Sequence, residues 1–376
     1  MIAHRPVLTL LCAVMKGNDV PPPPPEQQDV LLDLAREHRV ERLAAWRIGG
    51  AQLNVWFGPA AEELRVEARA HAVAEAVHTC ELRNVLEALA SIGGARPTLF
   101  KGGALAHSHY PEPWLRPRLD SDILISPSEI DPAFASLRAL GYEREIAISG
   151  TLVASQASFS RTDHFGLTHV VDLHWHIANM QVIAKMLPHD EVARRAVPIP
   201  PLGQHARAAA PADALTLACL HRAAHHRDSE ELLWIYDIHL LAAGLSESEW
   251  NAVVATAEQG AATALCARGL TLAIDRFGTP VPTIVMRRLD SGETSIRREP
   301  SAVFLSKDLR LVDGLISDLR SLPVRARIRL LAEHLFPPAE YIRARYRVTS
   351  RLSVAFAYAR RIATGLPRWF ALRGGS

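Results

Sequence analysis

The sequence has little cysteine and no long apolar run. The four cysteines, Cys12, Cys80, Cys219 and Cys266, lie far apart in the 376 residues and form no paired spacing. This argues against a cysteine-ligated metal site or a CxxC redox motif, and it favours buried free thiols in a reducing compartment. No apolar run approaches the roughly 18 to 20 residues needed to cross a bilayer. We therefore predict a soluble, cytoplasmic protein without a transmembrane segment.

A strong bias of composition is also absent. Hydrophobic residues make up 48% and charged residues 22% of the chain, close to globular averages, which argues against collagen-like, low-complexity and coiled-coil proteins. The length allows two or three domains and a sizeable core. The apolar segment 7–15 is short, and Lys16-Gly17-Asn18 follows it instead of a cleavage site, so we expect a core helix there and not a signal peptide.

The net charge is only +2, but the charge is distributed unevenly along the chain. Residues 320–376 hold twelve arginines and only two acidic residues, Glu333 and Glu340. Such a segment could bind a polyanion or an anionic membrane surface. We favour the alternative that these arginines lie on helices and pair with the more acidic remainder of the chain.

Hydrophobic periodicity divides the chain into helical and β-rich parts. A polyproline connector, 21–25, interrupts an otherwise helical N-terminal pattern. The predicted fold class is α+β, with an α+β core flanked by helical regions. The predicted domains are an N-terminal helical region 1–95, an α+β core 96–190, a helical domain 191–290 and a basic C-terminal helical region 291–376.

The predicted core contains several short β-rich segments. The expected strands lie at 97–100, 121–126, 141–148 and 168–177. A helix is expected between the second and third of these strands, at 127–140, with Ser128 as its N-cap.

The most informative passage is the segment 116–125, which contains the motif Asp120-Ser121-Asp122. Alternate residues of a strand face the same side, so Asp120 and Asp122 would stand together while Ile123 and Ile125 enter the core. Two like charges this close raise a carboxylate pKa unless a cation compensates. Hard divalent cations such as Mg²⁺ take oxygen ligands of this kind. The motif alone is weak evidence, because solvated strand ends also carry it.

A double glycine follows the first predicted strand of the core. The passage runs through Phe100 into Lys101, Gly102 and Gly103, and the next residues look like the first turns of a helix. Glycines there let backbone N–H groups approach a phosphate at the positive end of the helix, and Lys101 could add charge. A tight turn is the alternative interpretation.

Histidines accompany a third acidic residue further along the chain. Period-two alternation places Asp172, His174 and His176 on one face of the strand 168–177, opposite a core face that includes Ile177. This array could hold zinc, although the histidines could equally orient other ligands or contact a substrate. His221 and His225 lie at helical spacing, and we interpret them as helix packing.

Together these motifs carry a resemblance. The order is a strand, Lys101-Gly102-Gly103, a helix with Tyr110, Arg116, the Asp-x-Asp strand, and Val-Asp-Leu-His-Trp at 171–175. This set is similar to the uncharacterised bacterial nucleotidyltransferase family of the DNA polymerase β-like superfamily. The similarity extends over most of the chain, because the segments 220–237 and 335–338 also resemble members.

The resemblance implies a polymerase β-like mixed β-sheet with three catalytic carboxylates. Asp120 and Asp122 would coordinate two Mg²⁺ ions, and Asp172 would complete the catalytic and metal site. The nucleotide-binding residues would be Lys101, Gly102, Gly103, Arg116 and Arg118. The substrate would be a nucleoside triphosphate, with ATP as the first expectation.

The activity implied is transfer of a nucleoside monophosphate group from the triphosphate to an acceptor, with release of pyrophosphate. A small molecule, a glycan precursor or a peptide is favoured over RNA as acceptor. Candidate acceptor or supporting residues are His174, His176, His164, Tyr110, Trp234 and Asp237. The alternative is a non-catalytic nucleotide sensor or scaffold whose basic C-terminal surface docks a partner or RNA.

Overall fold

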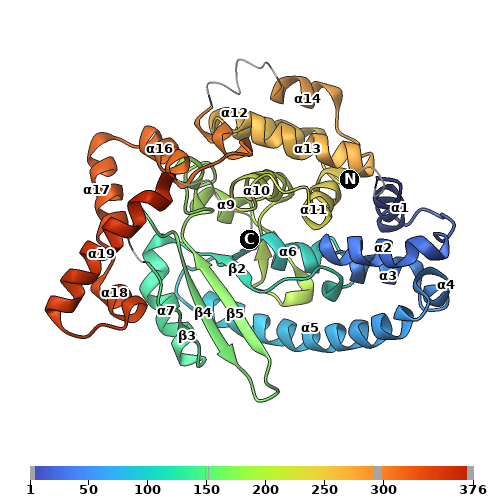
Figure 1. Cartoon of the computed structure of the whole chain (residues 1–376), viewed down its shortest axis with the longest axis horizontal. Coiled ribbons are helices and arrows are strands. Elements are labelled where there is room, and N and C mark those ends of the chain that lie inside the picture. The colour runs from blue at the N-terminus through green and yellow to red at the C-terminus, as the bar shows by residue number, and fades with distance from the viewer. Residues whose placement is uncertain (1–4, 149, 151, 291–298, 371–376) are drawn as a thin grey trace.

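The computed structural model describes residues 5–148, 150, 152–290 and 299–370, so the predicted region 291–376 is described only in part. It confirms the α+β class, because a mixed sheet of seven strands lies between helices (Figure 1). The first part of the chain is helical: α1 (Arg5–Met15), α2 (Pro25–Glu37), α3 (Glu41–Ile48), α4 (Leu53–Phe57) and α5 (Ala60–Ala90). Good helix formers fill α5, and Glu62 and Glu63 in its first turn interact favourably with the helix dipole.

The sheet combines parallel and antiparallel pairs. Its strands are β1 (Thr98–Phe100), β2 (Ser121–Leu124), β3 (Glu143–Arg144), β4 (Gln156–Thr162), β5 (Thr168–His174), β6 (Val197–Pro198) and β7 (Arg207–Ala208). Their order is β3-β4-β5-β2-β1-β7-β6. The central strands β2 and β5 are parallel, whereas β1 and β2, and β4 and β5, are antiparallel. The sheet therefore joins segments that are distant in the sequence.

Helices cover both faces of the sheet. On one face Leu99, Ile123 and Leu173 pack against α5 and α7 (Ile130–Ala139). Because strand side chains alternate, Phe100 and Leu124 lie on the opposite face, where they pack in a cluster with α8 (Gln181–Ala184) and α10 (Pro211–Ala224). This second face also carries the polar residues of the candidate site.

The remaining helices form two groups. The first includes α6 (Lys101–Ser108), α9 (His189–Arg195), α11 (Leu232–Ala243), α12 (Glu247–Gln259), α13 (Thr263–Phe277) and α14 (Thr283–Leu289). The second is the C-terminal arm, which consists of α16 (Leu311–Ser321), α17 (Val324–Leu335), α18 (Ala339–Tyr346) and α19 (Arg351–Phe370). Short 3₁₀ turns lie at Pro113–Leu115, Pro127–Glu129, Pro200–Leu202 and Pro300–Leu305.

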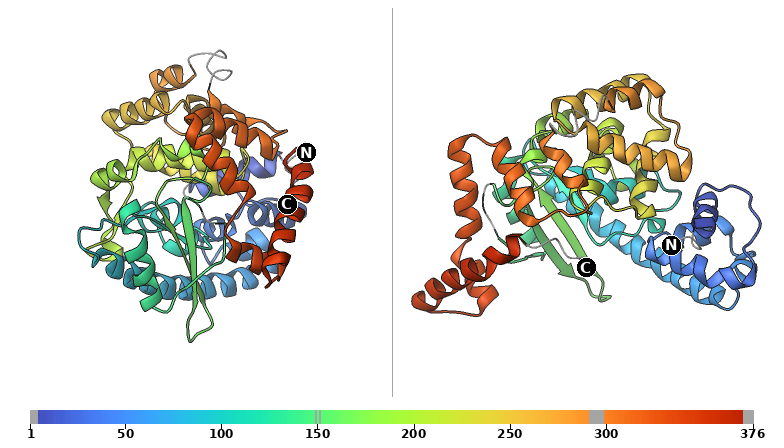
Figure 2. Two further views of the ribbon diagram at one scale, coloured as in Figure 1. Left: turned by 90° about the vertical axis from the view of Figure 1, so that its left-hand side faces the viewer. Right: turned by 45° about the horizontal axis from the view of Figure 1, so that its top comes forward.

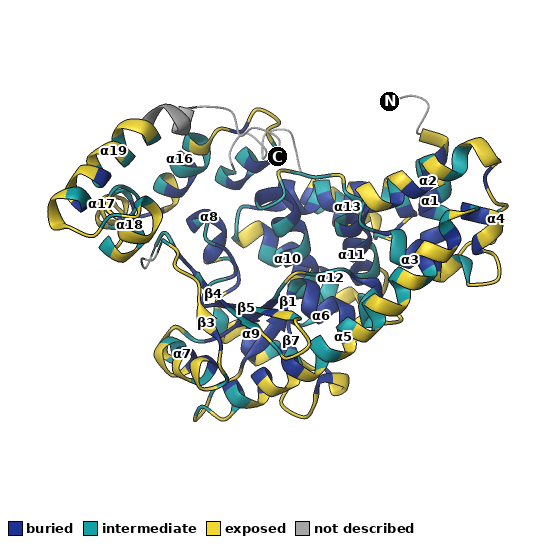
Figure 3. Cartoon of the chain, turned by 60° about the horizontal axis from the view of Figure 1, so that its bottom comes forward, coloured by how far each residue is buried: buried dark blue, intermediate teal, exposed yellow. Residues whose placement is uncertain are grey.

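The N-terminal helices and the C-terminal arm lie at opposite ends of the molecule (Figures 1 and 2). Helices α1 to α4 share a hydrophobic core with α11, α12 and α13, and the Tyr236 hydroxyl donates a hydrogen bond to the Met15 carbonyl at 3.2 Å. Among the described residues, the arm has a small apolar cluster of its own around Ile342, Val354 and Ala357. Buried residues accordingly concentrate around the sheet and the adjoining helices (Figure 3).

Several local predictions were wrong. The strand β4 was not predicted, and the segment 141–148 supplies only the two-residue β3. Ser126, not Ser128, caps the turn before α7, in a capping box with Glu129. Alternation along β5 continues to Trp175, but Ile177 packs in the cluster of the opposite face, because the strand ends at His174.

No described helix is both long and apolar enough to cross a membrane.

Candidate active site

Strand register brings two carboxylates together. Asp122 of β2 lies directly opposite Asp172 of β5 in a parallel pair, so both side chains project from the same face. His174 lies two residues further along β5. One ligand atom from each of these three buried residues lies within 4.8 Å of the others. The structure thus places two of the three predicted carboxylates, and one predicted histidine, in one cluster.

Asp122 has two nitrogen partners. The ammonium of Lys101 lies 2.7 Å from its Oδ1 atom, and Nε2 of His174 lies 2.8 Å from the same oxygen. Burial alone would raise the pKa of Asp122, but the charge of Lys101 and the contact with His174 outweigh burial and hold it well below the ordinary value. Lys101 has a positive φ of 53°, which non-glycine residues rarely adopt, at the first position of α6.

Asp172 is held by the neighbouring strand β4. The hydroxyl of Ser158 donates to its Oδ1 at 2.5 Å, and Nε2 of Gln156 donates to its Oδ2 at 3.1 Å. These two residues were missed because β4 was not predicted. The alternation of polar Gln156 and Ser158 with buried Ala157 and Phe159 was the signal that could have found them.

Asp120 precedes β2 and is only partly buried. Burial, followed by the charges of Asp122 and Asp172, raises the pKa of Asp120 to about 6. Its carboxylate is not one of the three clustered groups. Arg118 holds the backbone here, because Nη1 donates to the Asp120 carbonyl at 3.2 Å while Nη2 forms an ion pair with Glu75 of α5 at 2.7 Å.

The two glycines at the start of α6 have different surroundings. A Cβ atom on Gly102 would lie 2.0 Å from Nη1 of Arg116, so only glycine leaves room for this guanidinium. A Cβ atom on Gly103 would lie 3.4 Å from Cδ1 of Leu99, which is an ordinary contact. Gly102 therefore allows the buried guanidinium of Arg116 to approach the first turn of α6 closely.

Arg116 forms a buried ion pair across the domain. Its Nη2 lies 2.7 Å from Oδ2 of Asp237 on α11, and the Tyr110 hydroxyl donates to Oδ1 of the same carboxylate at 2.9 Å. The guanidinium also lies over the ring of Trp234, 5.3 Å from its centre. The structure thus brings together Tyr110, Arg116, Trp234 and Asp237, and it gives Arg116 a protein carboxylate as its partner.

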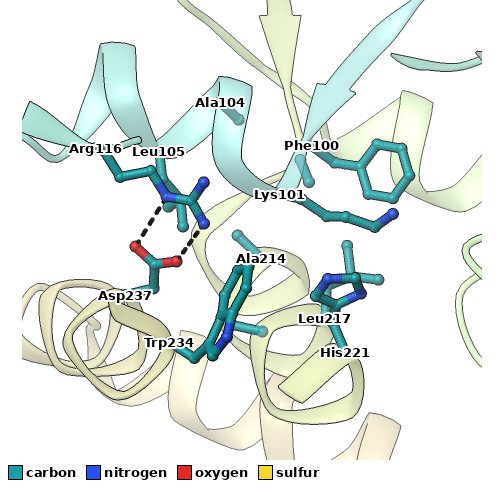
Figure 4. Close-up of a pocket in the computed structure, with 12 residues that line it drawn as sticks. Phe100, Lys101, Ala104, Leu105, Arg116, Ala214, Leu217, His221, Trp234 and Asp237 are labelled. Carbon is teal, nitrogen blue, oxygen red and sulfur yellow. Dashed lines mark hydrogen bonds and ion pairs between the residues drawn. The ribbon is translucent and has the colours of Figure 1, made fainter. Parts of the chain in front are cut away.

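A cavity of about 30 Å³ lies between α6, α10 and α11, all of which contribute side chains to its lining. Figure 4 shows Lys101 and His221 on one side of it and the Arg116–Asp237 pair on the other. A cavity of this volume holds about two water molecules, which is less than a nucleobase needs.

His221 in the last turn of α10 and His225, the residue that follows this helix, face the same region. His221 and His225 line a second small cavity together with Lys101. Burial, and then the charge of Lys101, lowers the pKa of His225 to about 3, so this ring is uncharged near neutral pH. The helical spacing of these histidines was visible in the sequence, but nothing in it showed that they face Lys101.

Two predicted residues lie apart from the cluster. His164 is exposed at the turn between β4 and β5, where its ring lies against that of Phe165. His176 follows the end of β5, and its pKa is lowered by burial and by Lys185. Neither belongs to the group formed by Asp122, Asp172 and His174.

The clustered groups suit a divalent cation. Two carboxylates offer the oxygen ligands that hard cations prefer, and Asp120 stands close enough to raise the local negative charge. Nδ1 of His174 is buried and has no hydrogen-bond partner among the described residues. The set thus provides both oxygen and nitrogen donors for an ion beside the positive end of α6.

Comparison with known proteins identifies one family. The model of the family described as uncharacterised nucleotidyltransferase matches residues 24–278, which is more than half of the chain. No curated protein matches the chain.

Proposed function

Because the chain belongs to the family of uncharacterised nucleotidyltransferases, we propose that it transfers a nucleoside monophosphate group from a triphosphate to an acceptor. The oxygen of an acceptor hydroxyl bonds to the α-phosphorus and its proton passes to solvent, while the bond from this phosphorus to the bridging oxygen breaks and pyrophosphate leaves. The observation that carries the proposal is the pairing of Asp122 with Asp172 on one sheet face, beside Lys101 and the start of α6.

Asp122 and Asp172 would hold Mg²⁺, with Asp120 as a third ligand and His174 as a nitrogen neighbour. Bound Mg²⁺ neutralises charge on the attacking and leaving oxygens of an in-line displacement. Ser158 and Gln156 fix the Asp172 carboxylate, so its orientation is set before a cation binds. Two ions remain the expectation for this site.

The start of α6 would bind the triphosphate. The backbone N–H groups of Gly102 and Gly103 lie at the positive end of the helix, where anions are stabilised. Lys101 now neutralises Asp122, and it would turn to a phosphate oxygen when a cation takes its place. We assign Arg116 and Arg118 a positioning role, because Asp237 and Glu75 are their partners.

The acceptor is proposed by class only. A small molecule, a glycan precursor or a peptide suits the proposal, and ATP is the first donor to test. The cavity beside Trp234 is too small for a base in this conformation, so α10 and α11 would have to separate if a base is to bind there.

The test measures transfer of label from each α-labelled nucleoside triphosphate, with Mg²⁺ and a lysate of the source organism. We expect Asp122→Asn and Asp172→Asn to lower transfer at least about a hundredfold. Asp131→Asn is the matched control, because Asp131 is exposed on α7. Transfer by Asp122→Asn at the wild-type rate would overturn the proposal. Binding of Mg²⁺ and ATP by the wild type without any transfer would establish the sensor or scaffold alternative instead.

A further inference from the structure

The C-terminal arm presents exposed arginines, most of which have no acidic partner among the residues that the structure describes. Ten arginines lie between residues 320 and 361, and all of them except Arg361 are exposed. Within the part of the chain that the structure describes, only Arg329 of this group pairs with a carboxylate, that of Glu333 on the same helix. The expected pairing with the acidic remainder of the chain was therefore wrong for these residues.

Several arginines outside the arm have partners on other parts of the chain. Arg118, Arg195 and Arg268 each pair with carboxylates of other elements or loops. Apart from Arg329, the exposed guanidinium groups of the arm thus form a positive surface that no carboxylate of the described residues neutralises. An anionic partner would gain from this surface, and added salt would weaken the attraction.

Helix α19 has two apolar faces. Its inner face packs onto the other helices of the arm through Val354 and Ala357, and the Arg361 guanidinium donates a hydrogen bond to the carbonyl of His334. The opposite face carries Leu352 and Phe356, which are 85% and 72% exposed. Ala359 and Ala363 continue the same exposed stripe at the helical period. Arg360 borders it.

Helix α17 repeats the pattern. Val324 and Ile328 lie four residues apart, and each is 66% exposed. Arg325 and Arg327 stand beside them on the same helix and are also exposed. Figure 3 shows the outer surfaces of α17 and α19 as exposed, at the end of the molecule that is remote from the N-terminal helices. Exposed apolar side chains are rarely grouped in this way on an unbound surface.

We propose that the C-terminal arm docks on an anionic phospholipid membrane, with the apolar stripes of α17 and α19 in the headgroup region and the arginines at the lipid phosphates. Helices with Leu and Phe on one face and arginines beside it bind membrane surfaces in this orientation. RNA phosphates would engage the arginines but would leave Leu352, Val324 and Ile328 in water. The membrane is therefore the partner that accounts for both features, and the proposal does not depend on nucleotidyl transfer.

The test is co-sedimentation of the full chain with vesicles of phosphatidylcholine alone or mixed with phosphatidylserine. We expect binding to the mixed vesicles, with at least about tenfold weaker binding for Phe356→Glu. The double variant Arg351→Gln/Arg360→Gln should lose about tenfold and show a weaker salt dependence. Phe165→Glu and Arg5→Gln are the matched controls, because Phe165 is exposed on the β4–β5 turn and Arg5 is exposed on α1, at the end of the molecule opposite the arm.

Three outcomes would overturn the proposal. The first is binding to mixed vesicles that Phe356→Glu leaves unchanged. The second is no vesicle binding together with salt-sensitive binding of RNA, which would assign the arginines to nucleic acid. The third is no vesicle binding together with a dimer in solution that Phe356→Glu dissociates, which would assign the stripes to a second copy. None of these variants touches the proposed active site, so transfer of label should remain at the wild-type rate.

Discussion

Replacing Asp120 by asparagine should stabilise the metal-free protein. The change keeps the size of the side chain and removes a carboxylate whose pKa is raised to about 6 by burial and by Asp122 and Asp172. A rise of about two pKa units above the ordinary value corresponds to about 3 kcal/mol near neutral pH. This value is an upper limit to the gain in the free energy of unfolding.

The stability gained by Asp120→Asn should increase with pH. Because the pKa is higher in the folded state, that state binds more protons than the unfolded state between about pH 4 and about pH 6. The contribution of Asp120 to stability therefore falls as the pH rises through this window and is constant above it. The advantage of Asp120→Asn should grow by about 1.4 kcal/mol between about pH 5 and about pH 8.

Urea denaturation in the presence of a chelator measures this difference. Asp33→Asn, on the exposed side of α2, is the matched control and should show no such pH dependence. Mg²⁺ should then stabilise the wild type more than Asp120→Asn, because binding to the folded state alone adds to its stability. A variant that is less stable than the wild type at every pH, or whose advantage is the same at every pH, would refute the reasoning.

Two further predictions concern the first turn of α6 and the ion pair beneath it. Gly102→Ala should lower the free energy of unfolding by about 2 to 3 kcal/mol, because the new Cβ atom would lie 2.0 Å from Arg116. Gly103→Ala should change the free energy of unfolding by less than about 1 kcal/mol, because its Cβ atom would lie 3.4 Å from Leu99. Thermal unfolding of the two variants compares them directly, and equal losses would contradict this account. Asp237→Asn should cost about 3 to 5 kcal/mol in urea denaturation, because it leaves the buried Arg116 guanidinium without its countercharge. Recovery of part of this loss in Arg116→Met/Asp237→Leu would identify the unpaired charge as its cause, and a loss below about 1 kcal/mol would argue against it.

Much of the fold was visible in the sequence because its signals are local. The long helix α5 and the strand around Asp122 follow from periodicity and residue type. The alternation of Asp172 and His174 with Val171 and Leu173 also placed these residues on opposite faces of β5 correctly. Strand β4 escaped because small polar residues fill much of it, so its β propensity is weak.

The candidate site was predicted only in part, because its contacts depend on the tertiary structure. The residue types at Asp122 and Asp172 indicated a cation, but the register that makes them neighbours joins β2 and β5, which α7, β3 and β4 separate in the sequence. Arg116 was expected at the phosphates, and its partner Asp237 comes from α11. The choice of partner for a buried cation cannot be inferred from local sequence. The catalytic roles of Asp120, Asp122 and Asp172 and the nucleotide-binding role of Lys101 stay predictions.

The parallel pairing of Asp122 with Asp172 also protects the chain against mispairing. If β5 shifted by one residue against β2, each of its side chains would move to the other face of the sheet. Asp172 and His174 would then enter the apolar layer under α5, and Leu173 would face Lys101. A buried carboxylate without a partner is strongly unfavourable there. The same charges that suit the site for a cation therefore exclude the nearest alternative registers, so substitutions that make Asp172 and His174 apolar should increase misfolding as well as reduce activity.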